Sequence, residues 1–331
     1  VPANSYVSHV FPSDMEATWI RLTADRDSIA TAHFSYGETG HDPRNGAALF
    51  SALAGVHDKD SSAAWVRPGQ HNLNLQVLRR QRTAAGHVTE AYREVNEVLS
   101  FNGPATDRSD EMREIAAVKK EFSVDAASVI MVEKGQRYRL PKGDARYDQP
   151  FATGWPRGIR ECESERYLLN VHGTFYEKPR EGGMLKIKPL ASHGKQIMDF
   201  CTWRGLFVVS GTRTDAQPDG HFFPDTAGHG LWFGAIDDLW KLGKPIGQGG
   251  PWKDAAVTAT VPSDPYLMTS YDKKTLALSH DGQQPVAFAV EVNVDHSAWH
   301  VYRSFSVPAG ETVTHEFPEG YDAHWLRLRA D

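Results

Sequence analysis

Apolar and polar residues alternate along many short stretches of this chain, and turn residues separate one stretch from the next. Alternation with a period of two residues is typical of strands that bury one face of a sheet. Most of the 28 Gly and 19 Pro residues fall between these stretches, as expected when turns join short strands. The pattern predicts strands at residues 18–24, 29–36, 73–80, 128–132, 230–236, 256–261, 266–270, 275–279, 286–292 and 300–307.

Four segments depart from this pattern. Residues 89–99 fit a strand or a short helix, and residues 107–121, rich in Glu, Lys and Ala, fit a short helix or an exposed connector. Residues 37–64 are polar and rich in small residues, which predicts a long loop carrying His41 and His57. Residues 237–243 fit a tight turn or a short 3₁₀ segment.

The stretch at 167–211 combines clear strand patterns with reactive side chains. Three strand-like runs lie at 167–177, 186–194 and 197–211, and each run ends in turn residues. Histidine, tyrosine, arginine and lysine side chains lie within or between the runs. We therefore expect this stretch to supply much of the functional site.

The two ends of the chain repeat each other. Residues 2–25 match residues 308–331 without a gap, and 12 of 24 positions are identical. A recurring unit in an all-β chain indicates radial or solenoid repetition. We therefore predict an all-β fold and a β-propeller, with residues 1–331 forming one propeller domain or the C-terminal part of one. Two similar β-modules that flank unrelated sequence are the alternative.

Composition narrows the functional classes. The formal charge of −6 gives no basic field to attract nucleic acid, and no apolar run approaches the ~20 residues of a membrane span. Aromatic residues make up 11% of the chain, which suits sheet packing or sugar stacking. No Walker A loop, dinucleotide-binding glycine motif, serine-hydrolase elbow or zincin motif is present. A chain that starts at Val1 is expected to be processed or a fragment, and a missing N-terminal portion would then be a partner.

Two segments resemble a known group of proteins. Residues 160–179 and 197–206 are similar to large secreted microbial β-propeller proteins linked to polysaccharide breakdown, which include rhamnosyl-glucuronate and ulvan-type lyases or hydrolases. The resemblance is best over residues 130–331. It implies a propeller that is seven-bladed when complete, a carbohydrate site on one face, and a secreted or periplasmic location. No catalytic motif carries over position by position, so the site residues are predicted from their chemistry.

The predicted catalytic residues are His172, Tyr176, His193 and Arg204. Elimination on a uronic acid requires one group that removes the C5 proton and one that protonates the leaving oxygen, and a His/Tyr pair can do both. Tyr176 lies about 13 Å from His172 along an unbroken strand, and closer if Gly173 forms a bulge. The alternative for His172 is an interior histidine satisfied by the backbone.

His193 and Arg204 also have two interpretations. His193 lies in a turn at a strand end, where it faces either a ligand or solvent. Arg204 lies in an apolar run and, if buried, requires a carboxylate from the substrate or from Asp199.

The predicted substrate-binding residues are basic or aromatic and come from three segments. They are Arg139, Lys142, Arg157, Arg160 and Trp203. The four cations could bind an anionic sugar or form a solvated face, and Trp203 could stack on a sugar or pack in the core. For hydrolysis, the candidate carboxylates are Glu161, Glu163, Glu165, Asp199, Asp237 and Asp238.

The sequence gives little support for a cofactor. Cys162 and Cys201 leave a disulfide open, and with His221, His229 and Asp225 they leave a zinc site open, but no metal-binding spacing is present. We expect no cofactor, with zinc or calcium as the alternative. The favoured function is a carbohydrate-active enzyme that cleaves an acidic or rhamnose/uronate-containing glycan by lyase or hydrolase chemistry. The alternative is a non-catalytic propeller that binds glycan or protein partners.

Overall fold

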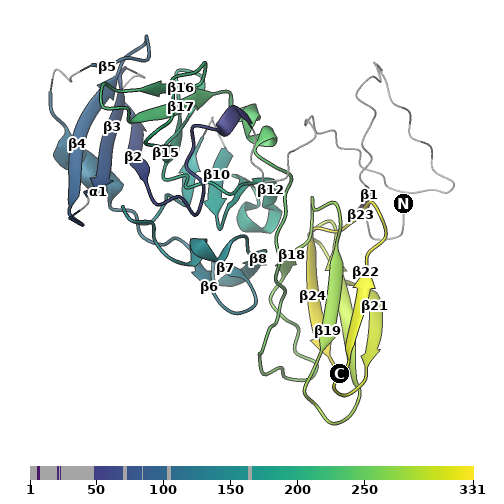
Figure 1. Ribbon diagram of the computed structural model, residues 1–331. Helices are drawn as coiled ribbons and strands as arrows, with labels where there is room; N and C mark the ends of the chain where they lie inside the picture. The colour runs from purple at the N-terminus through teal and green to yellow at the C-terminus, as the bar shows by residue number, and fades with distance from the viewer. Residues whose placement is uncertain are drawn as a thin grey trace.

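The computed structural model describes residues 6–7, 21, 23, 48–69, 73–83, 85–102, 106–162 and 166–331. The described part is mostly β-structure, which confirms the predicted all-β class (Figure 1). The strands expected at 18–24 and 29–36, the first copy of the end repeat and His41 lie outside the described residues, apart from a few isolated positions. Glu163 and Glu165 also lie outside them.

The first antiparallel sheet has the order β15-β2-β3-β4-β5. Its strands are β15 (Thr212–Arg213), β2 (Ser61–Pro68), β3 (Leu75–Arg82), β4 (Val88–Val95) and β5 (Phe101–Asn102). The loop expected through residue 64 is wrong from Ser61 onward, because small side chains there are buried as part of β2. Residues 89–99 contain a strand, not a helix.

The predicted helix at 107–121 is present as α1 (Ser109–Ala116). Met112 and Ala116, four residues apart, are buried on one face of α1, as amphipathic helices require. They contribute to a core with Trp65 and Leu78 of the first sheet.

Two further sheets follow, with the orders β12-β11-β10-β9 and β13-β14-β17-β16. Their strands are β9 (Ile159–Glu161), β10 (Arg166–Val171), β11 (Thr174–Pro179), β12 (Lys188–Ser192), β13 (Phe200–Trp203), β14 (Leu206–Val209), β16 (Phe222–Pro224) and β17 (Gly230–Gly234). The expected single runs at 167–177 and 197–211 are wrong, because each folds back as a hairpin.

Two-residue turns with positive φ explain both hairpins. His172 and Gly173 have φ values of 52° and 80°, and Arg204 and Gly205 have 51° and 77°. Both central residues in the left-handed region match the tight turn that suits the twist of a hairpin. His172 and Arg204 are therefore turn residues and not strand residues.

The three sheets share buried clusters. Phe175 of β11 packs with Phe200 of β13 and Phe207 of β14. Val66 of β2 belongs to a second cluster with Trp203. The third sheet, β13-β14-β17-β16, therefore packs against both the first sheet and the second.

The C-terminal strands extend a seven-stranded sheet with the order β21-β20-β24-β18-β8-β7-β6. Its strands are β6 (Ser123–Val124), β7 (Val129–Glu133), β8 (Gln136–Leu140), β18 (Tyr266–Leu267), β20 (Val286–Asn293), β21 (His300–Val307) and β24 (Trp325–Ala330). Two small pairings complete the strands, β19 (Thr275–Ser279) with β22 (Thr312–Glu316) and β1 (Tyr6–Val7) with β23 (Tyr321–Asp322). The strand expected at 256–261 is wrong, because that segment forms irregular backbone and a turn, and the Thr260 N–H donates to the Ala330 carbonyl of β24 at 2.7 Å.

The strands β19–β24 have a core of their own, and Figure 1 shows them apart from β2–β5. They are tied to the rest of the chain at a few defined points. Tyr266 of β18 pairs with Arg139 of β8 in parallel. The Trp325 indole N–H donates at 2.8 Å to the carbonyl of Leu185, which lies within η4 (Gly183–Lys186).

Two further 3₁₀ helices are η3 (Ala145–Asp148) and η5 (Ile236–Lys241), the second of which confirms the predicted 3₁₀ segment.

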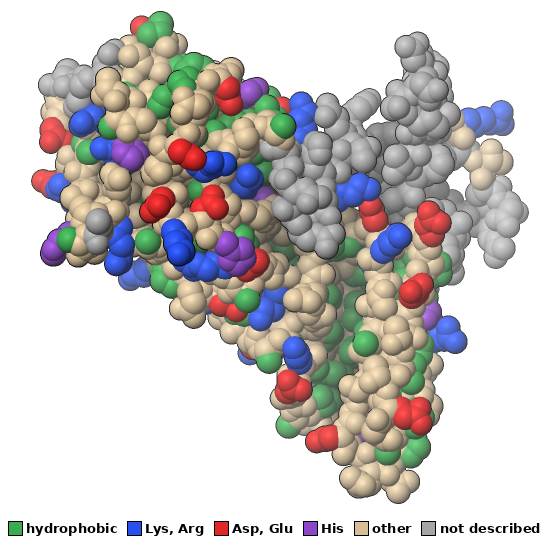
Figure 2. Space-filling view, viewed as in Figure 1, with side chains coloured by type: hydrophobic (Ala, Val, Ile, Leu, Met, Phe, Trp, Pro, Cys, Tyr) green, Lys and Arg blue, Asp and Glu red, His purple; other side chains and the backbone are tan. Residues whose placement is uncertain are grey.

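Acidic and basic side chains are interspersed over the face drawn in Figure 2. That face therefore carries no large field of one sign.

Candidate functional site

A small pocket opens beside the turn between β10 and β11. Its aromatic lining residues are Phe122, Tyr147, Phe151 and Trp155, and its polar lining residues are Gln149, Asn170 and His172. We call it the aromatic pocket. Apolar walls with a few convergent polar groups are typical of small-molecule sites, and aromatic faces suit sugar rings in particular.

His172 forms part of the wall of this pocket, and its side chain is fully buried. The Gly143 N–H donates to Nδ1 at 2.9 Å, and Nε2 lies 3.0 Å from Asp148 Oδ1. Because Nδ1 accepts, the ring proton lies on Nε2, which donates to the carboxylate. Burial lowers the pKa of His172 even though Asp148 opposes the shift, so the imidazole is neutral at pH 7.

The close approach of Gly143 to His172 depends on glycine. A Cβ at position 143 would lie 2.4 Å from the His172 carbonyl oxygen. Only glycine therefore lets the backbone approach closely enough for its N–H to reach Nδ1.

His193 lies behind the same pocket, and both of its ring nitrogens also have hydrogen-bond partners. Nε2 lies 3.0 Å from Asn170 Oδ1, and the Lys195 N–H donates to Nδ1 at 3.2 Å. The Tyr147 hydroxyl donates to the Lys195 carbonyl at 2.9 Å and packs its ring against His193. Burial lowers the pKa of His193 to about 3. His172 in the wall and His193 behind it are therefore neutral groups, and both ring nitrogens of each are occupied by hydrogen bonds.

Two partly exposed carboxylates lie near the pocket. The side chains of Asp148 and Asp144 are 32% and 38% exposed; Asp148 is the last residue of η3 and Asp144 is its N-cap. Asp144 Oδ2 lies 2.8 Å from Nε2 of His57, whose side chain is 69% exposed. Burial raises the pKa of Asp144, but hydrogen bonds from the Arg146 N–H and His57 outweigh it and lower the pKa overall. Two histidine–carboxylate pairs thus lie at opposite ends of one helical turn.

A lysine lies over two aromatic rings of the pocket. The Lys120 ammonium is 4.9 Å from the Trp155 ring centroid and 5.2 Å from that of Phe122. It also donates to the Asp148 carbonyl at 3.4 Å. This cation therefore lies over one face of the Trp155 ring.

Tyr176 and Arg204 lie outside the aromatic pocket. Tyr176 is fully buried in β11, and burial raises its pKa to about 12. Arg204 is exposed in its turn, with its guanidinium carbon 5.5 Å from the Trp203 ring. Arg204 is not buried, because the chain turns at this residue, and the alternative that pairs it with Asp199 is therefore wrong. The structure brings His172 and His193 together, but not with Tyr176 or Arg204.

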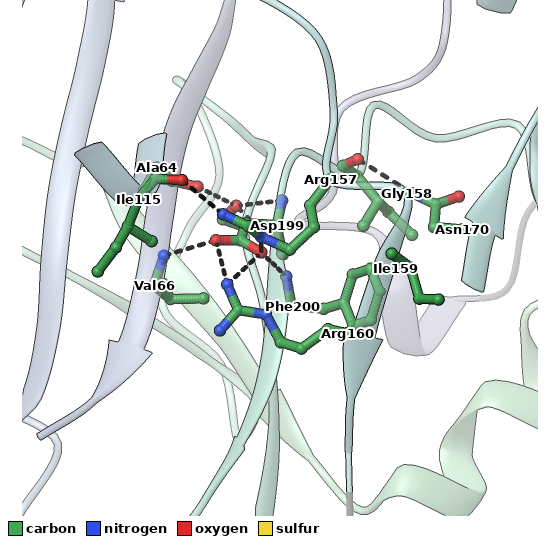
Figure 3. A network of polar contacts seen from close by, with 12 residues as sticks. Ala64, Val66, Ile115, Arg157, Gly158, Ile159, Arg160, Asn170, Asp199 and Phe200 are labelled. Atoms are coloured by element: carbon green, nitrogen blue, oxygen red, sulfur yellow. Dashed lines mark hydrogen bonds and ion pairs between the residues drawn. The ribbon is translucent and has the colours of Figure 1, made fainter. Parts of the chain in front are cut away.

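Arg157 and Arg160 converge on one buried carboxylate (Figure 3). Arg157 Nε lies 2.8 Å from Asp199 Oδ1, and Arg160 lies 2.9 Å from both carboxylate oxygens. The backbone N–H groups of Val66 and Phe200 donate to the same side chain, which is fully buried. Burial alone would lower the pKa of Arg160, but Asp199 raises it. In this structure both guanidinium groups neutralise Asp199.

The remaining predicted binding residues also have partners away from the pocket. Arg139 is buried and pairs with Asp125 at 2.7 Å and Asp264 at 2.9 Å. Lys142 donates to the Asp125 carbonyl at 3.2 Å. Trp203 is 1% exposed, and its indole N–H donates to a backbone carbonyl. The structure does not bring these residues to the aromatic pocket.

Sequence reasoning missed Tyr147, Asp148 and Trp155. All three lie between β8 and β9, in a segment that the strand pattern passed over as turns. A usable signal was present, because aromatic and acidic residues recur there within a long connection between strands, and long loops are often functional.

The structure also bears on the metal and disulfide alternatives. In the described part of the chain, no three His, Cys, Asp or Glu side chains are grouped to hold a metal. Cys162 and Cys201 are both buried, and no disulfide joins them. His221 stacks on Trp232, with ring centroids 5.3 Å apart. No helix among the described residues has the length and apolar character to cross a bilayer.

Comparisons with known proteins add little to this geometry. No family model and no curated protein matches the chain. A solved structure titled "Glycoside hydrolase" aligns with 80% of this chain and 80% of its own, at 8% identity and a TM-score of 0.16. A TM-score this low carries no argument about fold or function, so the proposal below depends on the site itself.

Proposed function

We propose that this chain is a carbohydrate-active enzyme that binds a glycan in the aromatic pocket and cleaves it by hydrolysis. The observation that supports this most is the accessible Asp148 carboxylate, which His172 holds at the edge of a pocket walled by aromatic rings. A sugar stacked on Trp155 would present its polar edge to these groups.

The state of the side chains favours hydrolysis over elimination by the His/Tyr pair. Both nitrogens of His172 are occupied, and Tyr176 is buried elsewhere with a raised pKa. In the proposed reaction, Asp148 acts as the base that activates water. His57, held by Asp144, donates the proton to the leaving oxygen. Asp144 is the N-cap of η3 and Asp148 is its last residue, so the proposed base and the His57–Asp144 pair lie at opposite ends of this turn.

We further propose an acidic glycan as the substrate and a propeller as the complete fold. Lys120, above Trp155, offers a charge partner for the carboxylate of a uronic acid. Antiparallel sheets of four strands that follow one another along the chain are compatible with propeller blades. A secreted or periplasmic location would give such an enzyme access to a polysaccharide.

A non-catalytic glycan-binding module is the second candidate. The observation that favours it is the saturation of both pocket histidines, which leaves His172 and His193 without a free nitrogen for proton transfer. Under this alternative, the aromatic rings bind the glycan and Asp148 only accepts hydrogen bonds from it.

The deciding experiment measures new reducing ends and ultraviolet absorbance in parallel on a panel of uronate-containing polysaccharides. Reducing ends without absorbance support hydrolysis, absorbance with new ends contradicts it in favour of elimination, and binding without either supports the module. Asp148→Asn should lower kcat by about 10²–10⁴-fold, the usual contribution of a positioned acid or base. Trp155→Ala should mainly raise KM.

Asp272→Asn is the matched control, because Asp272 is 69% exposed and pairs with Lys244 in another part of the chain. Full activity in Asp148→Asn would overturn the proposed role of Asp148. His172→Ala is less informative, because it also leaves the Gly143 N–H and Asp148 without a partner.

A further inference from the structure

One face of the first sheet carries two arginines side by side. Ala64 lies opposite Arg79 across β2 and β3, and Val77 lies opposite Arg93 across β3 and β4. Because alternate residues of a strand share a face, Val77 and Arg79 point the same way, and Arg93 joins them. The two guanidinium groups therefore lie on neighbouring strands of one face.

The β16–β17 connection covers this face and closes a pocket. Its lining includes Ser62, Arg79, Arg93, Phe101, Asp225 and His229. We call it the arginine pocket. Its walls come from β2, β3, β4, β5 and the connection, so segments far apart in the sequence meet there.

The Asp225 carboxylate in the arginine pocket accepts hydrogen bonds on both of its oxygens. Asp225 Oδ2 accepts from Arg79 at 2.7 Å, and Oδ1 accepts from the Ala227 and His229 N–H groups at 2.8 and 3.1 Å. The Asp225 side chain is only 9% exposed. Asp225 therefore balances Arg79 and leaves no acceptor facing the pocket for a second cation.

Arg93 and His229 retain unused donor capacity. The exposed guanidinium of Arg93 donates to the Tyr92 carbonyl at 2.7 Å, and no carboxylate of the described residues forms an ion pair with it. Nδ1 of His229 is buried without a hydrogen-bond partner. A buried polar atom without a partner is costly unless a ligand or water satisfies it. The lining therefore carries one uncompensated positive charge beside one unsatisfied imidazole nitrogen.

We propose that the arginine pocket is a binding site for a small oxyanion, a carboxylate or a sulfate group. Arg93 supplies the charge and a forked pair of donors, and His229 donates from Nδ1. The free donors of Arg79 complete the set, because only one of its nitrogens is held by Asp225.

This site is separate from the aromatic pocket. Arg80 follows Arg79 on β3 and points to the opposite face, where it donates to the Thr153 carbonyl at 3.3 Å. Thr153 belongs to the connection that carries Phe151 and Trp155. The two pockets thus lie on opposite faces of the first sheet, and oxyanion binding does not require the proposed hydrolysis.

The test is titration calorimetry with sodium acetate, sodium glucuronate and sodium sulfate at constant ionic strength. The wild-type chain should bind at least one of them saturably, and Arg93→Gln should weaken that binding by about tenfold or more. His229→Ala should weaken it by a smaller factor. Arg82→Gln is the matched control, because Arg82 is an exposed arginine on the opposite face of the same sheet.

Tighter binding of glucuronate than of acetate would support a sugar-borne carboxylate, and tightest binding of sulfate would support a sulfate group. The proposal is overturned if none of the three anions binds saturably. It is also overturned if Arg93→Gln and Arg82→Gln weaken binding equally, which would indicate diffuse charge attraction. Urea unfolding of each variant shows whether a loss of binding reflects a loss of fold.

Discussion

Replacing Asp199 tests whether the arginines at 157 and 160 serve the fold. Asp199→Asn keeps the size of the side chain but removes its charge. It also places an amide N–H₂ group among donors. Arg157 and Arg160, whose side chains are 17% and 16% exposed, would then lack their counter-charge.

The magnitude follows from the contacts of this one carboxylate. It accepts one hydrogen bond from Arg157, two from Arg160 and one each from the N–H groups of Val66 and Phe200. Adding about 1.5–3 kcal/mol for each bond would overestimate the effect, because desolvation of the ions opposes it. Breaking a buried ion pair by removing one partner costs about 3–5 kcal/mol, and we expect a loss of stability in this range.

Urea unfolding followed by tryptophan fluorescence measures this loss. With a slope of about 3 kcal/mol per M, the midpoint of Asp199→Asn should fall by roughly 1 M or more. Asp215→Asn is the control, because Asp215 is 69% exposed and pairs with Arg213, and such pairs contribute about 0–1 kcal/mol. Equal midpoints for the two variants would refute the reasoning. So would a loss of glycan binding in Arg157→Gln or Arg160→Gln without any loss of stability.

Two further outcomes follow from buried titratable groups. Burial lowers the pKa of His193 and of His324 to about 3, so between pH 6.5 and 3 the unfolded chain binds protons that the folded chain does not. The free energy of unfolding should have its full value above pH 6.5 and should fall by about 4 kcal/mol from pH 7 to pH 5. Urea midpoints measured at both pH values can check this. A pH-independent midpoint would contradict this. Cys162 and Cys201 are buried and not joined by a disulfide, and burial raises the pKa of the Cys201 thiol. A thiol reagent should therefore modify neither in the native chain and both in urea. Rapid modification of a native thiol would count against their burial.

The alternation of apolar residues predicted the strands best where each strand is regular and its turns are evident. Residues 300–307 form β21 at the expected bounds, and β20 differs from the expected range by one residue. In β21, buried residues near its C-terminal end alternate with exposed ones, and in β20 an apolar run is buried on both faces between turn residues, so the hydrophobic pattern marks both strands. The helix α1 was predictable for the same reason.

The hairpin turns were hidden because apolar residues continue on both sides of them. His172 and Arg204 adopt positive φ, which non-glycine residues seldom do, and only the glycine that follows each of them signals a turn. The strand β2 was missed because its Ser and Ala residues have weak β-propensity, although they are buried by neighbouring sheets. Both errors come from tertiary packing that overrides local preference.

The site was predictable only in part for a related reason. His172 and His193 are conspicuous in the sequence, but their hydrogen-bond partners decide what they can do. Asp148 lies 24 residues before His172, and Asp199 lies about 40 residues after the arginines it neutralises. No local spacing links such pairs, so their roles appear only once the chain is folded.

The parallel pairing of β18 with β8 also matters for any attempt to produce the chain in parts. β18 covers one side of β8, which pairs with β7 on its other side. A product that ended near residue 250 would leave that side of β8 with unpaired backbone groups and would remove Trp325 from the cluster it shares with Tyr138. Open strand edges invite pairing between molecules. Shortened products of this kind should therefore aggregate. By covering the edge of β8, the C-terminal strands prevent that self-association in the full chain.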